Sequence, residues 1–275
     1  MGGHVEIKAN FHTHMMFSDG KNTAEEVVLQ ALSLGFAGLG FSDHLDPEIP
    51  LDTKKYFEEI HRLQGVYGDR IDILAGVELD VLKDPSEAAG AQYVIGSVHY
   101  LDLDTEMPKG IDCSEDIIKN LADHFYGGDY YRLAKAYYDL EAQVYDRTKC
   151  TFIGHFDLVT RFNDSMHFLD EEDPRYVKPA LEAMEYLVTK GVPFEINCGA
   201  VNRGRKAELY PNLFLLRKLC EMGGEIVISS DAHQKELLNG AFDIAVERAV
   251  ACGFTHTNIL SSKDGAVYWR QVALK

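Results

Sequence analysis

Several histidines of this chain stand beside carboxylates in short motifs whose spacing suits metal binding. His12 and His14 form an H-x-H pair, and Asp231 and His233 form a D-x-H pair of the same spacing. Side chains two residues apart on an extended backbone point to the same side, so both members of a pair can reach one ion. Imidazole and carboxylate ligands without a thiolate suit zinc, manganese or iron.

The candidate ligands extend well beyond these two pairs. They are His12, His14, Asp19, His44, Glu78, His99, His155, Asp231 and His233. A single histidine of this kind is more often a satisfied core or surface residue than a ligand, so only the whole set indicates a metal site. The set is too large for one tetrahedral ion and would serve two or three ions, with a carboxylate between them. Closely spaced ions activate water and clamp the oxygens of an in-line displacement at phosphorus.

Short apolar runs alternate with longer amphipathic stretches along the chain. The predicted strands are Ile7–Phe11, Ala37–Phe41, Ile71–Val77, Tyr93–Val98, Thr151–Gly154, Val192–Asn197 and Glu225–Ser229. The predicted helices, in which apolar residues recur at helical spacing, are Thr23–Leu34, Thr53–Tyr67, Asp129–Tyr145, Pro174–Thr189, Asn212–Met222 and Leu238–Ala251. Strands that alternate with helices predict parallel βα units.

Capping residues mark the ends of several predicted helices. Thr23 and Glu26 have the spacing of a capping box that opens a helix. Gly35, Gly191 and Gly223 fall where helices should end, because glycine readily adopts the left-handed conformation of a C-terminal cap.

Each predicted strand delivers a chemically active side chain just past its C-terminal end. Glu78 follows the third strand, for example, His99 the fourth and His155 the fifth. In a β/α barrel these strand ends meet at one mouth, where active sites form, whereas an open sheet would spread them along an edge. The sequence therefore predicts an α/β fold, a TIM-like (β/α)7 barrel. No linker or repeat interrupts the pattern, so we expect a single domain over residues 1–275.

The chain carries 44 acidic and 27 basic side chains, a formal net charge of −17. Such acidity disfavours a nucleic-acid binder and contact with anionic membranes. The apolar runs are too short to cross a bilayer, and Met1–Lys8 lacks the features of a signal peptide. The five cysteines are scattered without a C-x-x-C motif, which suits free thiols in a reducing compartment. We expect a cytoplasmic protein with no nucleic-acid or membrane partner.

Taken in chain order, the motifs resemble those of the polymerase and histidinol phosphatase (PHP) superfamily. They are His12-x-His14, Asp19-Gly20, Ser42-Asp43-His44, Gly76-x-Glu78, Gly96-Ser97-Val98-His99, Gly154-His155-Phe156-Asp157 and Ser230-Asp231-Ala232-His233. The resemblance extends from about Phe11 to His233 and is strongest to the stand-alone histidinol-phosphate phosphatases of bacterial histidine biosynthesis. It implies a distorted seven-stranded barrel with a trinuclear metal centre that hydrolyses L-histidinol phosphate to L-histidinol and phosphate.

The resemblance also implies how the candidate ligands divide among three divalent ions. The first ion would be bound by His12, His14, Glu78 and Asp231, the second by Glu78, His99 and His155, and the third by Asp19, His44 and His233. Family members contain zinc, iron or manganese, so the identity of the metal stays open. Asp231, His233 or His44 would give a proton to the leaving alkoxide, and the sequence does not choose among them.

Two arginines are implied to bind the substrate phosphate. Arg161 lies in Ile153–Phe162 and Arg203 in Glu195–Gly204, and both segments resemble phosphate-binding segments of the phosphatase branch. A guanidinium makes planar, bidentate contacts to phosphate oxygens, although a surface salt bridge explains either residue taken alone. Arg205 stands next to Arg203 and could substitute for it.

Two further expectations concern the surroundings of the centre. Asp157 would hydrogen-bond one of the ligand imidazoles. The segment Leu101–Lys149 is rich in Asp, Glu and Tyr. It could fold over the mouth and meet the amine and imidazole of histidinol, and a plain solvated helical excursion explains it equally well.

Other functions stay open on the residues alone. A PHP phosphoesterase for nucleotide or sugar phosphates would use the same centre, whereas a polymerase-associated nuclease fits an acidic chain poorly. A metal-binding protein without catalysis would not need Arg161 and Arg203. An amidohydrolase barrel would call for a lysine near a middle strand end, where none stands. The oligomeric state stays open, and the acidic shell favours a small phosphate ester whose other end is positive.

Overall fold

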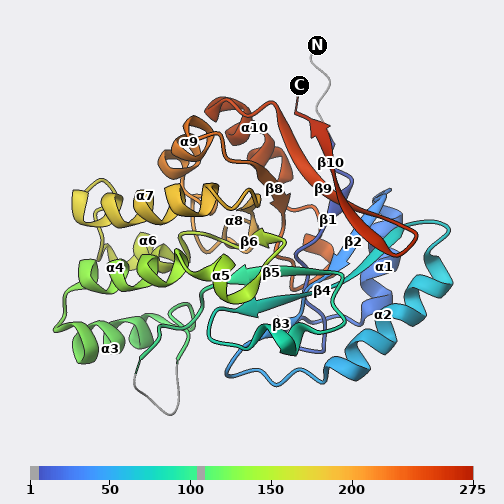
Figure 1. Ribbon diagram of the computed structural model, residues 1–275, viewed down its shortest axis with the longest axis horizontal. Coiled ribbons are helices and arrows are strands. Elements are labelled where there is room, and N and C mark those ends of the chain that lie inside the picture. The colour runs from blue at the N-terminus through green and yellow to red at the C-terminus, as the bar shows by residue number, and fades with distance from the viewer. Residues whose placement is uncertain (1–5, 104–108, 275) are drawn as a thin grey trace.

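The computed structural model describes residues 6–103 and 109–274. Within them, ten strands join in one sheet in the spatial order β1-β2-β4-β5-β6-β7-β8-β9-β10, with β3 beside β4 (Figure 1). The strands are β1 (Ala9–Asn10), β2 (Gly38–Phe41), β3 (His44–Leu45), β4 (Asp72–Asp80), β5 (Tyr93–Ser97), β6 (Phe152–Ile153), β7 (Phe194–Asn197), β8 (Ile226–Ser229), β9 (His256–Lys263) and β10 (Ala266–Ala273). Neighbouring strands are parallel except β9 and β10. Most of Met1–Lys8 and part of Leu101–Lys149 lie outside the described residues.

The helices lie on the outside of the sheet. They are α1 (Ala24–Ser33), α2 (Thr53–Tyr67), α3 (Glu115–Tyr126), α4 (Tyr130–Glu141), α5 (Val144–Thr148), α6 (Asn163–Met166), α7 (Pro174–Val188), α8 (Gly199–Asn202), α9 (Leu213–Glu221) and α10 (Phe242–Cys252), with 3-10 turns η1 (Pro85–Ala88), η2 (Leu158–Thr160) and η3 (Lys235–Leu237). Helix α1 packs on α2, and a second series of contacts joins α3, α4, α7, α9 and α10 (Figure 1). No helix among the described residues is long and apolar enough to span a membrane.

All seven predicted strands are present, as β1, β2 and β4 to β8. Strands β2, β7 and β8 are buried at every residue, as expected of parallel strands that helices cover. The sequence pattern does not predict β3, β9 or β10, so the sheet is larger than expected. The predicted helix over 129–145 is divided into α4 and α5, where Gln143 N donates to Leu140 O at 2.9 Å in a 3-10 contact.

The predicted helix caps are confirmed. Thr23 Oγ1 accepts a hydrogen bond from Glu26 N at 3.3 Å, and Glu26 Oε2 accepts one from Thr23 N at 3.0 Å. Gly35, Gly191 and Gly223 follow helix ends with φ of +69°, +70° and +75°, a region that glycine enters without steric cost. These caps fix where α1, α7 and α9 start or stop, and so where the chain returns to the next strand.

Hydrogen bonds between the first and eighth strand exits close the barrel at its mouth. His14 N donates to Ala232 O at 2.9 Å, and Ala232 N donates to His12 O at 3.2 Å. This parallel bridge between Thr13 and Ala232 lies just beyond β1 and β8. It brings the H-x-H pair and the D-x-H pair side by side although more than two hundred residues separate them in the chain.

The β9–β10 hairpin covers the other end of the barrel. Strand β9 pairs with β8 at Val227 and Asn258, and Ser262 donates to Asp72 on β4 through its N and Oγ at 2.7 and 2.6 Å. The hairpin therefore bridges two distant strands of the sheet. These features confirm the fold class, a distorted TIM-like α/β barrel, while the single-domain extent over residues 1–275 stays a prediction.

One tyrosine fills the barrel interior over glycines of neighbouring strands. The Tyr93 hydroxyl lies 2.8 Å from Phe11 O and 2.9 Å from Phe41 O, and can donate to either. A Cβ added to Gly76 would lie 2.3 Å from the Tyr93 ring. Glycine is therefore required at Gly76 because the ring occupies the space of a side chain.

We expect Gly76→Ala to destabilise the protein by about 1–3 kcal/mol through overpacking. Gly65→Ala is the matched control, because Gly65 is exposed within α2 and has nothing within 4 Å of an added Cβ. There alanine should stabilise by up to about 1 kcal/mol through its higher helix propensity. Urea unfolding of the metal-stripped protein measures both, and equal effects from the two substitutions would contradict this packing.

Candidate metal centre

The structure brings all nine predicted ligands to the mouth of the barrel. His12 and His14 follow β1, Asp19 lies in the loop after them, His44 is in β3, Glu78 is in β4, His99 follows β5, His155 follows β6, and Asp231 and His233 follow β8. Because parallel strands end at the same rim, side chains from distant parts of the sequence face one another there.

Glu78 is the centre of this cluster, and its carboxylate is buried. Oε1 lies 2.8 Å from His155 Nε2 and 3.4 Å from His99 Nε2. It also accepts a hydrogen bond from Ser97 Oγ at 2.7 Å. One oxygen of Glu78 thus faces the exits of β5 and β6.

The second oxygen of Glu78 faces the other side of the mouth. Oε2 lies 3.1 Å from His44 Nδ1, 3.2 Å from His12 Nε2 and 3.5 Å from His14 Nε2. Among the described residues, this oxygen and all three nitrogens are buried without a hydrogen-bond partner. Buried donors and acceptors that face one another unpaired are costly, and a divalent cation would satisfy them together. The residues therefore fit a metal centre.

Asp231 supplies a second buried carboxylate beside His14. Its Oδ1 lies 3.3 Å from His14 Nε2, and its Oδ2 lies 3.2 Å from Arg203 Nη2. The backbone of Asp231 is left-handed, with φ +47°, a conformation that aspartate tolerates better than most residues. A Cβ at Gly199 would come within 2.6 Å of Asp231 Oδ2. The backbone after β7 can therefore pass this close to the carboxylate only because residue 199 is glycine.

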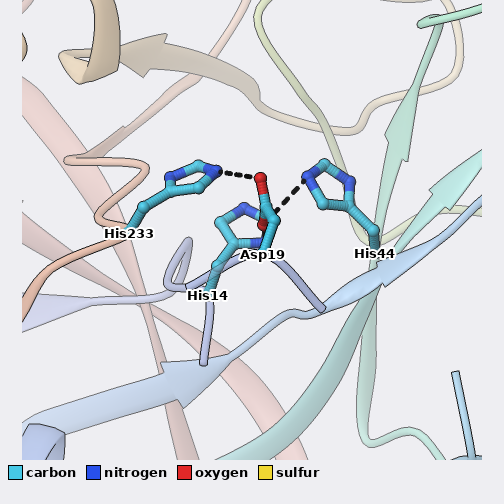
Figure 2. Close-up of side chains that lie close together, drawn as sticks. All are labelled: His14, Asp19, His44 and His233. Carbon is cyan, nitrogen blue, oxygen red and sulfur yellow. Dashed lines mark ion pairs between the residues drawn. The ribbon is translucent and has the colours of Figure 1, made fainter. Parts of the chain in front are cut away.

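Asp19 joins three histidines at the outer edge of the cluster, where Figure 2 shows it between His233 and His44. Its Oδ2 lies 3.0 Å from His233 Nε2, and its Oδ1 lies 3.6 Å from His44 Nε2 and 3.8 Å from His14 Nδ1. The three imidazoles and the carboxylate converge on one small volume, as expected of ligands to a shared ion.

Asp43 shapes the loop that carries Asp19. Its Oδ1 accepts hydrogen bonds from Met15 N at 3.0 Å and from Ser18 N and Oγ at 2.9 and 2.7 Å. A Cβ at Gly20 would lie 2.3 Å from His14 O, so the loop turns back tightly at that glycine. The Asp-Gly and Ser-Asp-His motifs are therefore coupled, because the second motif holds the first in place.

Three groups of the described residues have ligand atoms within 4.8 Å of one another. They are His14, Asp19, His44 and His233; His12, His14 and Asp231; and His44, Glu78 and His99. The first contains the implied set Asp19, His44 and His233 with His14 added, and the second contains the implied set His12, His14 and Asp231 without Glu78, so the division among ions stays a prediction. The third includes His44 where the resemblance places His155, whose Nε2 nonetheless contacts Glu78.

Glu195 on β7 is a functional residue that the sequence reasoning missed. Its Oε1 lies 2.6 Å from His12 Nδ1, and its Oε2 accepts from His155 N at 2.8 Å and from Asn197 Nδ2 at 2.9 Å. Ser229 Oγ also hydrogen-bonds Oε1. The carboxylate contacts the imidazole of one candidate ligand and the backbone of another, and the signal for it is a glutamate inside a wholly buried strand.

The expected role of Asp157 is wrong. Its Oδ2 accepts from Asn212 N at 2.9 Å, and no imidazole contacts it among the described residues. Burial raises the pKa of this carboxyl to about 7. Although Asp157 is two residues from His155, the 3-10 turn η2 begins right after it and directs the side chain to the start of α9.

Burial and neighbouring charges set the protonation of the cluster. Burial, followed by the charges of two neighbouring histidines, lowers the pKa of His14 to about 3. Burial also lowers the pKa of His12, but the carboxylates around it, Glu195 foremost, hold it well above its ordinary value. Burial lowers the pKa of His99 as well, but the negative charge of Glu78 outweighs this effect, so the pKa of His99 lies well above its ordinary value. Protons would therefore compete with metal ions for His12 and His99 and leave when ions bind, whereas His14 is already deprotonated near neutral pH.

Seven of the nine candidate ligands, all except His12 and His14, line a cavity of about 220 Å³ together with three arginines. The predicted residues Arg161 and Arg203 both reach it, and their buried Nε atoms have no hydrogen-bond partner among the described residues. Burial and the charges of these two side chains lower the pKa of the third, Arg205. Guanidinium groups that repel one another beside unpaired donors form a site for an anion.

We expect Glu195→Gln to weaken zinc binding about 10- to 100-fold, because an amide NH₂ replaces one of the two oxygens that contact the His12 imidazole and the His155 backbone N. Competition with a chromophoric chelator measures the affinity. Glu185→Gln is the control, since Glu185 is an exposed glutamate on α7, and it should bind zinc like the unmodified protein. An unchanged affinity in Glu195→Gln would show that this carboxylate does not support the centre.

Comparisons with known proteins agree with this geometry. The PHP domain family model matches residues 10–199. The chain is 26% identical to the probable histidinol-phosphatase of Schizosaccharomyces pombe, over 91% of this chain and 88% of that protein. It is 30% identical to the probable histidinol-phosphatase of Deinococcus radiodurans, over 82% of this chain and 85% of that protein.

A solved structure shares the fold. It is the histidinol phosphate phosphatase of Lactococcus lactis in complex with zinc, L-histidinol and phosphate, with a TM-score of 0.69 and 22% identity over 95% of this chain and 98% of that one. The barrel, the cluster at its mouth and the family match lead to one conclusion, that the chain belongs to the PHP domain family.

Proposed function

We propose that this protein is a metal-dependent phosphomonoesterase that hydrolyses L-histidinol phosphate to L-histidinol and phosphate. One observation carries the proposal: a carboxylate and imidazole cluster shares its cavity with three arginines. The first group of side chains is suited to cations and the second to an anion. The curated relatives are named as histidinol-phosphatases, and the zinc, L-histidinol and phosphate in the Lactococcus lactis structure support the same reaction.

The centre would hold three divalent ions of zinc, iron or manganese. The proposed ligands are His12, His14, Asp19, His44, Glu78, His99, His155, Asp231 and His233. When bound, such ions lower the pKa of water and offset the negative charge on phosphate oxygens. Glu78 would contact more than one ion, since its two oxygens face different histidines.

Arg161 and Arg203 would bind and orient the phosphate. Arg203 is fixed from one side, because its Nη1 donates to Asp231 O at 2.8 Å and to His233 Nδ1 at 2.9 Å, while its Nε stays unpaired among the described residues. Positioned guanidinium groups stabilise the charge that spreads over the equatorial oxygens during phosphoryl transfer. Arg205 adds positive charge at the same wall of the cavity.

A proton must reach the leaving alkoxide, and His233, His44 and Asp231 are the candidates. The exposed fraction of the side chain is 20% for His233, 12% for His44 and 10% for Asp231. His233 is therefore the most accessible from the cavity. All three side chains are also proposed ligands, so each could give a proton only through an atom that no ion occupies. In His233, Nε2 lies 3.0 Å from Asp19 Oδ2 and Nδ1 accepts from Arg203 Nη1, so the choice among the three stays open.

The charge of the protein indicates a small substrate. The net charge is −17, so a polyanion such as nucleic acid or an anionic membrane would be repelled over most of the surface. Contacts within the cavity, rather than attraction over long distances, would then select the phosphate ester.

We expect the purified, metal-loaded protein to release phosphate from L-histidinol phosphate more efficiently than from AMP or p-nitrophenyl phosphate. Removing the metal should abolish the activity, and restoring zinc, manganese or iron should recover it. Arg161→Ala and Arg203→Ala should each lower kcat/KM about 10²- to 10³-fold, because each removes a donor to the transition state.

Arg217→Ala is the matched control, since Arg217 is an exposed arginine on α9, and its kinetics should be unchanged. Activity that survives complete metal removal would contradict the proposed function. Faster hydrolysis of AMP than of L-histidinol phosphate would contradict the proposed substrate.

A further inference from the structure

The cavity contains one acidic side chain that the metal centre does not use. Among the described residues that line it, the carboxylates are Asp19, Glu78, Asp112 and Asp231. Three of them are proposed ligands, and only Asp112 is not. Asp112 lies in the segment Leu101–Lys149, which the sequence indicates could meet the amine and imidazole of histidinol or be a plain solvated excursion, without singling out any residue.

Asp112 is held close to the metal centre by backbone contacts. Ile111 N donates to His99 O at 2.8 Å, and Cys113 N donates to Gly110 O at 3.2 Å in a tight turn. The Ile111 side chain is fully buried. The turn therefore fixes Asp112 relative to a candidate ligand.

The Asp112 carboxylate is paired only loosely with a phosphate-binding arginine. Its Oδ2 lies 3.6 Å from Arg161 Nη1, which is beyond hydrogen-bond distance. The side chain of Asp112 is 24% exposed and that of Arg161 is 13% exposed. A carboxylate accepts several hydrogen bonds, so Asp112 can accept from a substrate donor while it stays next to Arg161.

These contacts match the chemistry of an amino phosphate ester. In L-histidinol phosphate the ammonium and the ester oxygen are attached to adjacent carbons, so a phosphate bound to Arg161 brings the ammonium toward Asp112. We propose that Asp112 binds the substrate ammonium and so determines specificity for a phosphate ester with a cationic leaving group. This inference rests on the proposed function.

A comparison of two substrates with three variants tests the proposal. The substrates are L-histidinol phosphate and 3-(imidazol-4-yl)propyl phosphate, which differs from the first only in that a hydrogen replaces the ammonium group. The measured quantity is the ratio of kcat/KM for the first substrate to that for the second. In the unmodified protein the ratio should be at least about tenfold, because a hydrogen bond between charged groups contributes about 10- to 100-fold.

Asp112→Asn should reduce this ratio about 10- to 100-fold, mainly through KM for L-histidinol phosphate. Asp112→Glu keeps the charge and should retain most of the preference. Asp116→Asn is the matched control, because Asp116 is an exposed aspartate at the start of α3, and its ratio should equal that of the unmodified protein. The metal content of each variant shows whether the centre is intact.

Two results would overturn the inference. One is a ratio near unity in the unmodified protein, which needs no variant to interpret. The other is an equal loss on both substrates in Asp112→Asn, since that would mean that Asp112 acts by positioning Arg161 and not by binding the ammonium. If the unmodified, metal-loaded protein hydrolysed neither substrate, the proposed function itself would fail, and the inference with it.

Discussion

The structure depends on how the barrel accommodates one buried carboxylate, that of Glu78. A charge taken out of water is stable only when opposite charges and hydrogen bonds surround it. Within the described residues, five imidazoles lie within 3.5 Å of its two oxygens. They come from the exits of β1, β5 and β6 and from β3, so the charge can be neutralised only if these strands end at one place. The bridge between Thr13 and Ala232 that closes the mouth is therefore part of the site as well as of the fold.

A second set of interactions supports the cluster from behind and adds positive charge on its cavity side. Glu195 lies behind His12 and His155. It contacts the imidazole of His12 and accepts from the backbone N of His155, so it orients the first ring and holds the backbone that carries the second. On the cavity side, Arg161 and Arg203 supply positive charge, and the Nε atom of each has no hydrogen-bond partner among the described residues. The result is a small site for cations and a phosphate inside a protein of net charge −17. Short contacts, rather than the field of the whole molecule, determine what such a site binds.

Much of the fold and of the candidate site could be predicted from the sequence. Parallel strands buried on both faces are continuous apolar runs, and the polar residue after each run marks the rim, as at Glu78. The β9–β10 hairpin was not predictable in this way, because it follows the last motif and carries no chemistry. Glu195 was missed because an apolar pattern predicts burial but not which buried polar group contacts which ligand. The predicted contact of Asp157 with a ligand imidazole was wrong. Asp157 is only two residues from His155, but the chain enters a 3-10 turn there, and the spacing along the chain then no longer determines where the side chain points.

The central claim is that the two oxygens of Glu78 would hold different metal ions. Anomalous diffraction from crystals of the active, metal-loaded protein, collected at the absorption edge of the bound metal, tests it most directly. The account predicts three anomalous peaks per chain around Glu78, with its two oxygens bound to different ions. A fully active protein with a single peak, or with no peak beside Glu78, would contradict the account.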